Sequence, residues 1–189
     1  MDCLESTSRE DAGKRMTAPH GGEDAAAYRR AMREFAAGVA IVACGAGDHR
    51  AGCTVTALTS LSLSPPTLLV CLGRDALTLA RLRESRAFSV NLLAPRHREL
   101  ADVFAGRDGV HGVARFALGR WTSLITGAPM LADALAAIDC RVEEIIERHS
   151  HALIIGEPLS FIANPVDDAL IFWRSRYGSS GAGDKVAAE

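Results

Sequence analysis

The sequence has little of what marks several common classes of protein. Its 21 basic and 23 acidic residues leave a net charge of −2, so there is no basic field for nucleic acid or for an anionic membrane. No apolar run approaches the roughly 18 to 20 residues that cross a bilayer. The N-terminal stretch MDCLESTSREDAGKR has no apolar segment of the kind that a secretory signal needs. We therefore expect a cytoplasmic protein with no nucleic-acid or membrane partner.

Familiar catalytic and metal motifs are also missing. The five cysteines include no CxxC pair and the six histidines no HExxH pair, which predicts reduced thiols and no metal site. There is neither a GxSxG elbow nor a GxxxxGK[ST] phosphate loop. The adjacent acids Glu143-Glu144 and Asp167-Asp168 are typical of a solvated edge. Acid/base hydrolysis therefore has little support.

The remaining pattern is mainly β, with short helices between the strands. Residues 1–23 predict a disordered tail, 24–177 a single domain and 178–189 a flexible tail. Helices are predicted over 25–37 with Asp24 as the cap, over 76–85 with Asp75 as the cap, and over 95–104. Strands are predicted over 39–44, 51–63, 67–72, 87–93, 149–161 and 169–173, and over the end of 134–144 after a short helix. Strands joined by short turns indicate an antiparallel barrel with helical decoration.

One predicted strand carries many hydroxyl groups and no charge. Its hydroxyls fall mostly on even positions, at Thr54, Thr56, Ser60, Ser62 and Ser64. Serine and threonine offer a donor and an acceptor without a charge to desolvate, which suits a planar, polar ligand. The same pattern fits the wet outer face of an ordinary sheet, and spacing alone does not decide between the two. The alternation slips at Leu58-Thr59, which predicts a bend or bulge there.

Seven segments, in order, resemble the flavin reductase-like family. They are FAAGVAIVAC (35–44), GCTVTALTSLSLSPPTLLVCL (52–72), AFSVNLL (87–93), LADVFAG (100–106), RFALGRW (115–121), GAPMLADALAAIDCRV (127–142) and HALIIGEP (151–158). The resemblance implies an antiparallel Greek-key split β-barrel of the FMN-binding type. It also implies a homodimer with one flavin, FMN or FAD, per subunit near the interface. The electron donor would be NADH or NADPH.

The resemblance further implies which residues form the site. The isoalloxazine and the start of the ribityl chain would lie on the hydroxyl-bearing stretch, at Thr54, Val55, Thr56, Ala57, Ser60, Leu61, Ser62 and Leu63. Ser89 and Asn91 would lie near the polar tail of the flavin. Phe116, with Trp121, would either wall the flavin or fill the core or the dimer interface.

His151 takes the position of the family's histidine and would border the nicotinamide as the catalytic residue. Here the sequence departs from the family, because Gly-Asp-His is replaced by His149-Ser150-His151. The change removes the glycine of the turn and the acid that would orient the imidazole.

The resemblance implies an NAD(P)H-dependent flavin reductase that supplies reduced flavin to a partner monooxygenase. Hydride transfer between two bound rings needs no protein nucleophile, which agrees with the missing motifs. The alternative is a module that holds flavin for electron transfer or storage without turnover, and the altered turn before His151 motivates it. A third reading, oxidation of a small amine, would need a cationic phosphate-binding cluster. The basic residues instead fall on helical patterns.

Overall fold

The structure is a computed structural model, and it describes residues 22–164 and 168–181. The chain divides into two compact units, Met1–Glu34 and Phe35–Glu189. In the first unit, helix α1 spans Gly22–Met32. Asp24 therefore lies inside the helix rather than capping it, and the predicted extension to residue 37 is wrong because residues 37 and 38 enter a strand. Most of the two predicted tails, residues 1–21 and 182–189, lies outside the described residues.

The second unit contains every strand of the described chain. The strands are β1 (Ala37–Gly38), β2 (Ala40–Cys44), β3 (Ala51–Val55), β4 (Leu58–Leu63), β5 (Pro66–Gly73), β6 (Ala87–Leu92), β7 (Trp121–Thr122), β8 (Met130–Leu131), β9 (Ala136–Arg148), β10 (His151–Ala163), β11 (Leu170–Trp173) and β12 (Arg176–Ser179). Its helices are α2 (Leu77–Ser85) and α3 (Arg98–Phe104), with 3₁₀ turns η1 (Gly47–His49), η2 (Pro95–His97) and η3 (Gly112–Ala117). None of the helices in the described part of the chain is long and apolar enough to cross a membrane.

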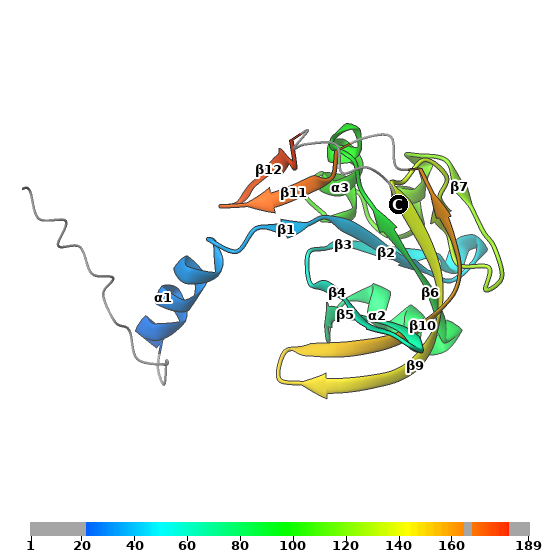
Figure 1. Ribbon diagram of the computed structural model, residues 1–189, viewed down its shortest axis with the longest axis horizontal. Coiled ribbons are helices and arrows are strands. Elements are labelled where there is room, and N and C mark those ends of the chain that lie inside the picture. Colours follow the sequence, from blue (N-terminus) through cyan, green and yellow to red (C-terminus); the bar gives the residue numbers. More distant parts are fainter. Residues whose placement is uncertain (1–21, 165–167, 182–189) are drawn as a thin grey trace, which may run out of the picture. The chain divides into compact units, whose positions relative to one another are not determined.

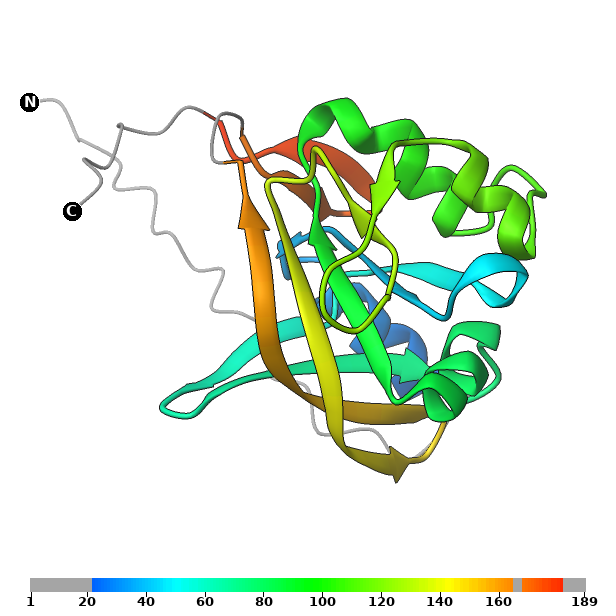
Figure 2. The same ribbon diagram turned by 90° about the vertical axis from the view of Figure 1, so that its right-hand side faces the viewer.

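Seven antiparallel strands form the main sheet, in the order β3-β2-β6-β9-β10-β5-β4. Strands β3 and β4 follow one another in the chain yet lie at opposite ends of this order. Only Thr56 and Ala57 separate them, so the sheet must roll until its two ends meet. Figures 1 and 2 show this roll, with the long β9–β10 pair (yellow and orange) curving around the barrel. The predicted antiparallel split barrel is confirmed.

The turn between the two sheet ends falls two residues earlier than the sequence predicts. Strand β3 ends at Val55 and β4 begins at Leu58, so the bend lies at Thr56-Ala57 and not at Leu58-Thr59. A bulge follows inside β4, where the register against β5 shifts between Ser60 and Ser62 and leaves Leu61 as the extra residue. The alternation in the sequence indicated the irregular segment but placed the bend two residues too late.

Alternating side chains of the sheet fill two cores. Ala40, Val42 and Cys44 of β2 point into the barrel. Ile41 and Ala43 point to the other side, where α3 and η3 cover the sheet. This period of two explains why β2 reads as a continuous apolar run, since both of its faces are buried.

Of the three other helix predictions, the one over 95–104 is confirmed by η2 and α3 and two differ in detail. Helix α2 forms and buries Leu79 and Leu82 completely, but its N-cap is Ala76 and no side chain caps it, so the expected role of Asp75 is wrong. The segment before residue 138 forms no helix, because β9 is already extended from Ala136.

Candidate functional site

The bend between β3 and β4 opens onto a groove of about 160 Å³. Its walls come from four parts of the second unit: the end of β1, the bend itself, the residues after α3 and the β11–β12 hairpin. The lining residues are Val39, Thr54, Val55, Thr56, Ala105, Arg107, Phe172 and Tyr177. The structure therefore brings three of the predicted flavin residues, Thr54 to Thr56, to one open groove.

The hydroxyls at the bend have different environments. Thr54 Oγ1 donates a hydrogen bond of 2.7 Å to the carbonyl oxygen of Ala101, which ties β3 to α3. Thr56 and Ala57 are exposed at the bend. Thr54 is therefore a structural anchor of the groove, whereas Thr56 and the backbone around it face the open side.

A cation and two aromatic rings form the opposite wall. The guanidinium of Arg107 lies 5.3 Å from the ring centre of Tyr177 and 5.8 Å from that of Phe172. Arg107 Nη1 also pairs with Asp102 Oδ1 at 2.6 Å. Burial is the main cause that raises the pKa of the Tyr177 hydroxyl, and the cation of Arg107 partly opposes this shift. The wall therefore offers a positive charge that lies beside two aromatic rings, one of which is a neutral phenol.

Strand β4 continues the surface from the bend. It pairs only with β5 in the described sheet, so its other edge turns alternate backbone N–H and C=O groups away from any strand. Ser60, Leu61 and Leu63 are exposed, and Leu63 keeps 86% of its surface accessible. Because the bulge at Leu61 breaks the alternation, hydroxyls and leucines both reach the outside.

Two predicted flavin residues are buried instead. Ser89 and Asn91 have no accessible surface. Asn91 Nδ2 donates to the carbonyl oxygen of Ile41 at 3.1 Å and to Ser89 Oγ at 3.0 Å, while its Oδ1 accepts from the Leu131 amide at 2.7 Å. Ser89 Oγ donates to the Pro129 carbonyl. These side chains hold the segment before β8 onto the sheet, and neither lines the groove at the bend. That they lie near the polar tail of the flavin stays a prediction.

A third polar residue of this network was missed by sequence reasoning. Asp139, the register partner of Ser89 across β6 and β9, is also fully buried. Its carboxylate accepts hydrogen bonds from the amide of Thr126, at 2.8 Å, and from the Thr126 hydroxyl. The alternation along β9 puts Ile138, Cys140 and Val142 on the face that fills the barrel and Asp139 on the other face. It could not show that the loop before β8 covers that face.

Phe116 belongs to the second core. Its ring meets Phe104 edge-on at 5.0 Å and lies 4.9 Å from Trp121. The Arg50 guanidinium covers it at 5.0 Å, and only 5% of its surface is accessible. Of the two roles that the sequence left open for Phe116, the structure favours packing.

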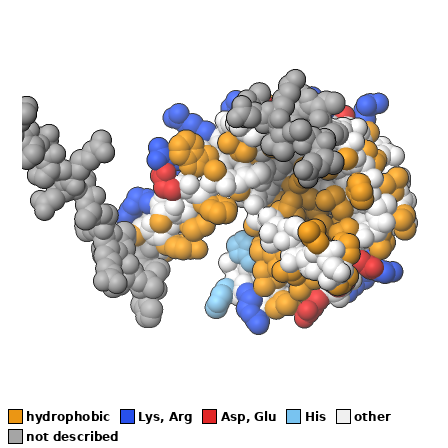
Figure 3. Space-filling model, in the orientation of Figure 1, with side chains coloured by type: hydrophobic (Ala, Val, Ile, Leu, Met, Phe, Trp, Pro, Cys, Tyr) orange, Lys and Arg blue, Asp and Glu red, His pale blue; other side chains and the backbone are white. Residues whose placement is uncertain are grey.

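His151 stands at the end of the β9–β10 hairpin. It faces Arg148 across the hairpin and Gly73 on β5, and its side chain is exposed. Figure 3 shows histidine side chains standing out from the surface there, beside a basic side chain. Two positions further along β10, Leu153 pairs with Cys71, whose amide donates to the Ala57 carbonyl at 3.0 Å. Strand spacings of about 3.3 Å along and 4.8 Å across then put His151 about 12 Å from the bend on the same sheet.

The substituted turn keeps a regular hairpin. His149 takes the position of the family's glycine with a left-handed backbone, φ 50°, which is the conformation that favours glycine. Ser150 takes the position of the acid, and its Oγ lies 2.9 Å from Nδ1 of His151. The imidazole therefore retains a hydrogen-bonding partner despite the changed sequence.

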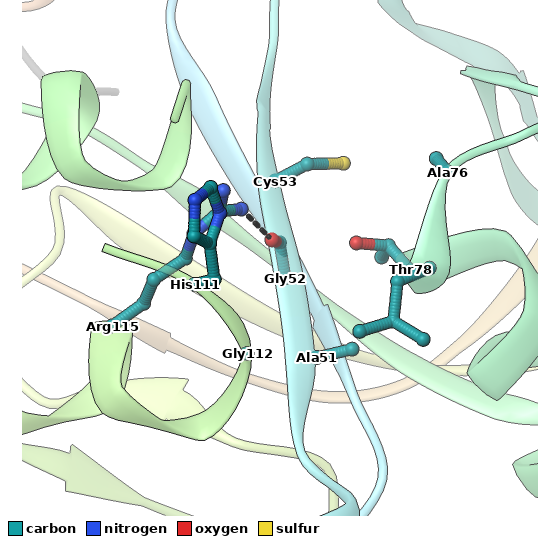
Figure 4. Close-up of a pocket in the computed structure, with 9 residues that line it drawn as sticks. Ala51, Gly52, Cys53, Ala76, Thr78, His111, Gly112 and Arg115 are labelled. Atoms are coloured by element: carbon teal, nitrogen blue, oxygen red, sulfur yellow. Dashed lines mark hydrogen bonds between the residues drawn. The ribbon is translucent and has the colours of Figure 1, made fainter. Parts of the chain in front are cut away.

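A second cavity, of about 260 Å³, lies beside β3 and was not predicted (Figure 4). His111 and Arg115 stand on one side of the strand, and Thr78, at the start of α2, stands on the other. Arg115 is held by three carbonyl oxygens, those of Val110 at 2.9 Å, Gly52 at 3.1 Å and Phe104 at 3.2 Å. Burial raises the pKa of the Cys53 thiol in this cavity, so the thiol stays protonated. The cavity thus contains neither a thiolate nor an unengaged guanidinium.

The groove at the bend fits a flavin by the chemistry of its donors. A flavin presents a flat ring edged with carbonyl and nitrogen groups and a tail that ends in phosphate. The free edges of β3 and β4 and the hydroxyl of Thr56 suit the ring edge, and Arg107 suits the phosphate. A rolled antiparallel sheet with an open groove where its ends meet places the protein in the split-barrel class of ligand-binding proteins.

Comparison with known proteins agrees with this class. The family described as flavin reductase like domain matches residues 32–181, and the chain belongs to this family. FMN reductase (NADH) RutF of Agrobacterium fabrum is 39% identical over 150 residues, which cover 79% of this chain and 85% of the relative.

Solved structures give the same result. The NADH:FAD oxidoreductase SgcE6 of Streptomyces globisporus C-1027 superposes with a TM-score of 0.78 at 30% identity, covering 88% of this chain and 98% of that one. BorF, the flavin reductase component of a bacterial two-component tryptophan halogenase, gives a TM-score of 0.75 at 30% identity and covers 82% and 98% of the two chains.

Proposed function

We propose that the protein is an NADH-dependent flavin reductase that binds FMN at the groove of the β3–β4 bend. The observation that carries this proposal is the position of the bend, which joins the two free edges of the barrel beside Arg107. The Agrobacterium relative is named for FMN and NADH, and it shares more identical residues with this chain than the FAD-dependent SgcE6 does. FMN is therefore the first flavin to test, with FAD second.

Each part of the groove has a role in this proposal. The backbone of Thr56-Ala57 and the free edge of β4 from Ser60 to Leu63 face the isoalloxazine. Arg107 faces the phosphate, and its partner Asp102 holds the guanidinium in place. Thr54, Ser89 and Asn91 support these surfaces from behind. When flavin is bound, it supplies the group that accepts a hydride from the reduced nicotinamide.

His151 borders the nicotinamide in this proposal. Its exposed ring at the end of β10 leaves Nε2 open to a ligand, while Nδ1 faces Ser150. The residue positions one ring against the other and transfers no proton, so neither a nucleophile nor a strong base is required. Because the hairpin forms with His149 in place of glycine, the changed turn no longer favours a passive flavin carrier.

The proposal extends to a homodimer. Leu61 and Leu63 on β4 and Phe161 on β10 are exposed, with 53%, 86% and 72% of their surfaces accessible. Apolar side chains of this size at the surface are typical of an interface between subunits. The mass of the protein in solution, measured by light scattering, tests this part. A monomer at micromolar concentration would contradict it.

Release of reduced flavin to a separate monooxygenase completes the proposal. BorF is the flavin reductase component of a two-component tryptophan halogenase, which supports a separate flavin-using partner enzyme for this chain. We expect FMN and protein, mixed anaerobically with NADH, to lose the absorbance of oxidised flavin within seconds. Flavin that stays yellow under these conditions would favour the passive carrier.

A variant of Arg107 tests the groove itself. Arg107→Gln removes the charge, and a charge-assisted hydrogen bond at a half-exposed site predicts a KM for FMN that rises about tenfold. Riboflavin has no phosphate, so its KM should stay the same. Arg120→Gln, at an exposed arginine that does not line the groove, is the matched control. An equal rise for FMN and riboflavin would show that Arg107 does not bind the phosphate.

A further inference from the structure

The turn before His151 is held in place from outside the hairpin. The Arg74 amide donates to the Ser150 carbonyl at 3.0 Å, and the Arg74 guanidinium donates to the His149 carbonyl at 3.3 Å. The same guanidinium pairs with Glu147 at 3.0 Å, and Arg83 also contacts this carboxylate. The backbone of the two turn residues is therefore fixed to the segment that follows β5.

The side chain of Ser150 extends from this fixed backbone toward the neighbouring ring. Ser150 Oγ lies 2.9 Å from Nδ1 of His151. Within the described residues, this is the only hydrogen bond to either ring nitrogen of His151. A neutral imidazole has one donor and one acceptor nitrogen, so the partner of Nδ1 decides what Nε2 presents.

We propose that Ser150 is a positioning residue that donates its hydroxyl proton to Nδ1 of His151. This hydrogen bond leaves the proton of the ring on Nε2, which then donates to the carboxamide oxygen of the nicotinamide. A carboxylate at position 150 would favour the opposite tautomer, with the ring proton on Nδ1, because a carboxylate accepts a hydrogen bond from Nδ1–H. The nicotinamide part of this inference rests on the proposed function, whereas the tautomer of His151 does not.

The tautomer can be measured without any activity. Long-range ¹H–¹⁵N spectra of the full-length protein, with no ligand, should show His151 protonated on Nε2 and hydrogen-bonded at Nδ1. In Ser150→Ala the Nδ1 signal should move downfield because the hydrogen bond is lost, and in Ser150→Thr it should stay. Ser150 is exposed, so the variants are expected to fold. An unchanged Nδ1 signal in Ser150→Ala would overturn the proposal.

Steady-state kinetics test the consequence for the nicotinamide. Ser150→Ala should raise the KM for NADH about fivefold, the scale of one lost hydrogen bond, with the KM for FMN unchanged. Ser150→Thr, which keeps the hydroxyl, should have the wild-type KM for NADH. Ser85→Ala, at an exposed serine at the end of α2, is the matched control. Equal rises for NADH and FMN would mean that Ser150 acts only on the structure of the hairpin and would refute the positioning role.

The two sets of measurements separate the proposals. If wild-type protein does not oxidise NADH with any flavin, the proposed function fails, and with it the nicotinamide contact. The Nδ1 signal then still decides whether Ser150 sets the tautomer of His151.

Discussion

Replacing Asn91 by alanine distinguishes a flavin ligand from a structural residue at the position where the family resemblance implied a ligand. Asn91 is fully buried and joins three parts of the second unit, through the Ile41 carbonyl on β2, Ser89 on β6 and the Leu131 amide on β8. Alanine can make none of these hydrogen bonds. The change therefore takes one hydrogen bond from the buried Ile41 carbonyl and leaves the Leu131 amide without the Asn91 oxygen that it donates to.

The size of the effect follows from these two groups. A buried polar group that loses its partner costs about 1 to 3 kcal/mol, so Asn91→Ala should lower the free energy of unfolding by about 3 kcal/mol. A chain of this size has an m-value of about 2 kcal/mol/M in urea. The midpoint of urea unfolding should therefore fall by about 1.5 M.

The assay pairs urea unfolding with titration of FMN into the folded variant at low temperature. Unfolding should become much easier, while the Kd for FMN should stay within about twofold because no atom of Asn91 reaches the groove. Asn164→Ala is a suitable control, since Asn164 Nδ2 donates to the carbonyls of Ala132 and Ala134 at a half-buried site. Asn164→Ala should lower the free energy of unfolding by about 1 kcal/mol.

The opposite pattern would refute this reasoning. A midpoint that moves by less than 0.5 M, roughly 1 kcal/mol at this m-value, together with a large loss of FMN affinity, would make Asn91 a direct ligand. The contacts that bury Ser89 and Asn91 would then have to open when flavin binds.

Two further predictions concern the hairpin turn and a buried histidine. His149→Gly should raise the free energy of unfolding by about 0.5 to 1 kcal/mol, because glycine takes φ 50° without the strain of a side chain; a lower urea midpoint would contradict this. His97 is buried, and burial lowers its pKa, while the Asp133 carboxylate, 3.4 Å from Nε2, partly opposes the shift. The folded state thus binds this proton less tightly than the unfolded chain, so stability present above pH 6.5 should be lost as the pH falls below it. When the pH is lowered from 7.5 to 5.5, the urea midpoint should fall further in the wild type than in His97→Asn. Equal falls in the two proteins would exclude His97 as the cause.

The sequence predicts most of the barrel because its strands differ in pattern from its helices. The continuous apolar run of β2 and the period-two alternation of β6 and β9 reflect two cores on opposite faces of one sheet, and the strands lie close to where these patterns begin and end. The strands of two residues, such as β1 and β7, give no such signal because they are too short to alternate. β1 forms by pairing with β11, which lies far along the chain, and β7 by pairing with β8 across the loop that joins them.

The candidate site is harder to predict, because alternation tells which side chains share a face but not what covers it. Ser89, Asn91 and Asp139 share one face of the sheet, and their polarity resembles a wet or ligand-binding surface. The segment between η3 and β8 folds over this face and takes up their hydrogen bonds. Thr54 is similar, since its hydroxyl reaches a carbonyl of α3 that lies 47 residues away in the sequence.

The hydroxyl-rich stretch owes its place in the proposed flavin site to topology as much as to composition. β3 and β4 are the two ends of the sheet, so each has one edge with unpaired backbone groups, and the bend at Thr56-Ala57 is where the chain passes from one edge to the other. A flat ring placed on the bend would desolvate any side chain beneath it, and this costs far more for a charged group than for a hydroxyl. The absence of charge from Thr54 to Ser64 is therefore what a bend lying against a flavin requires. The same absence in the middle of a sheet, as at Ser89 and Asn91, only reflects burial.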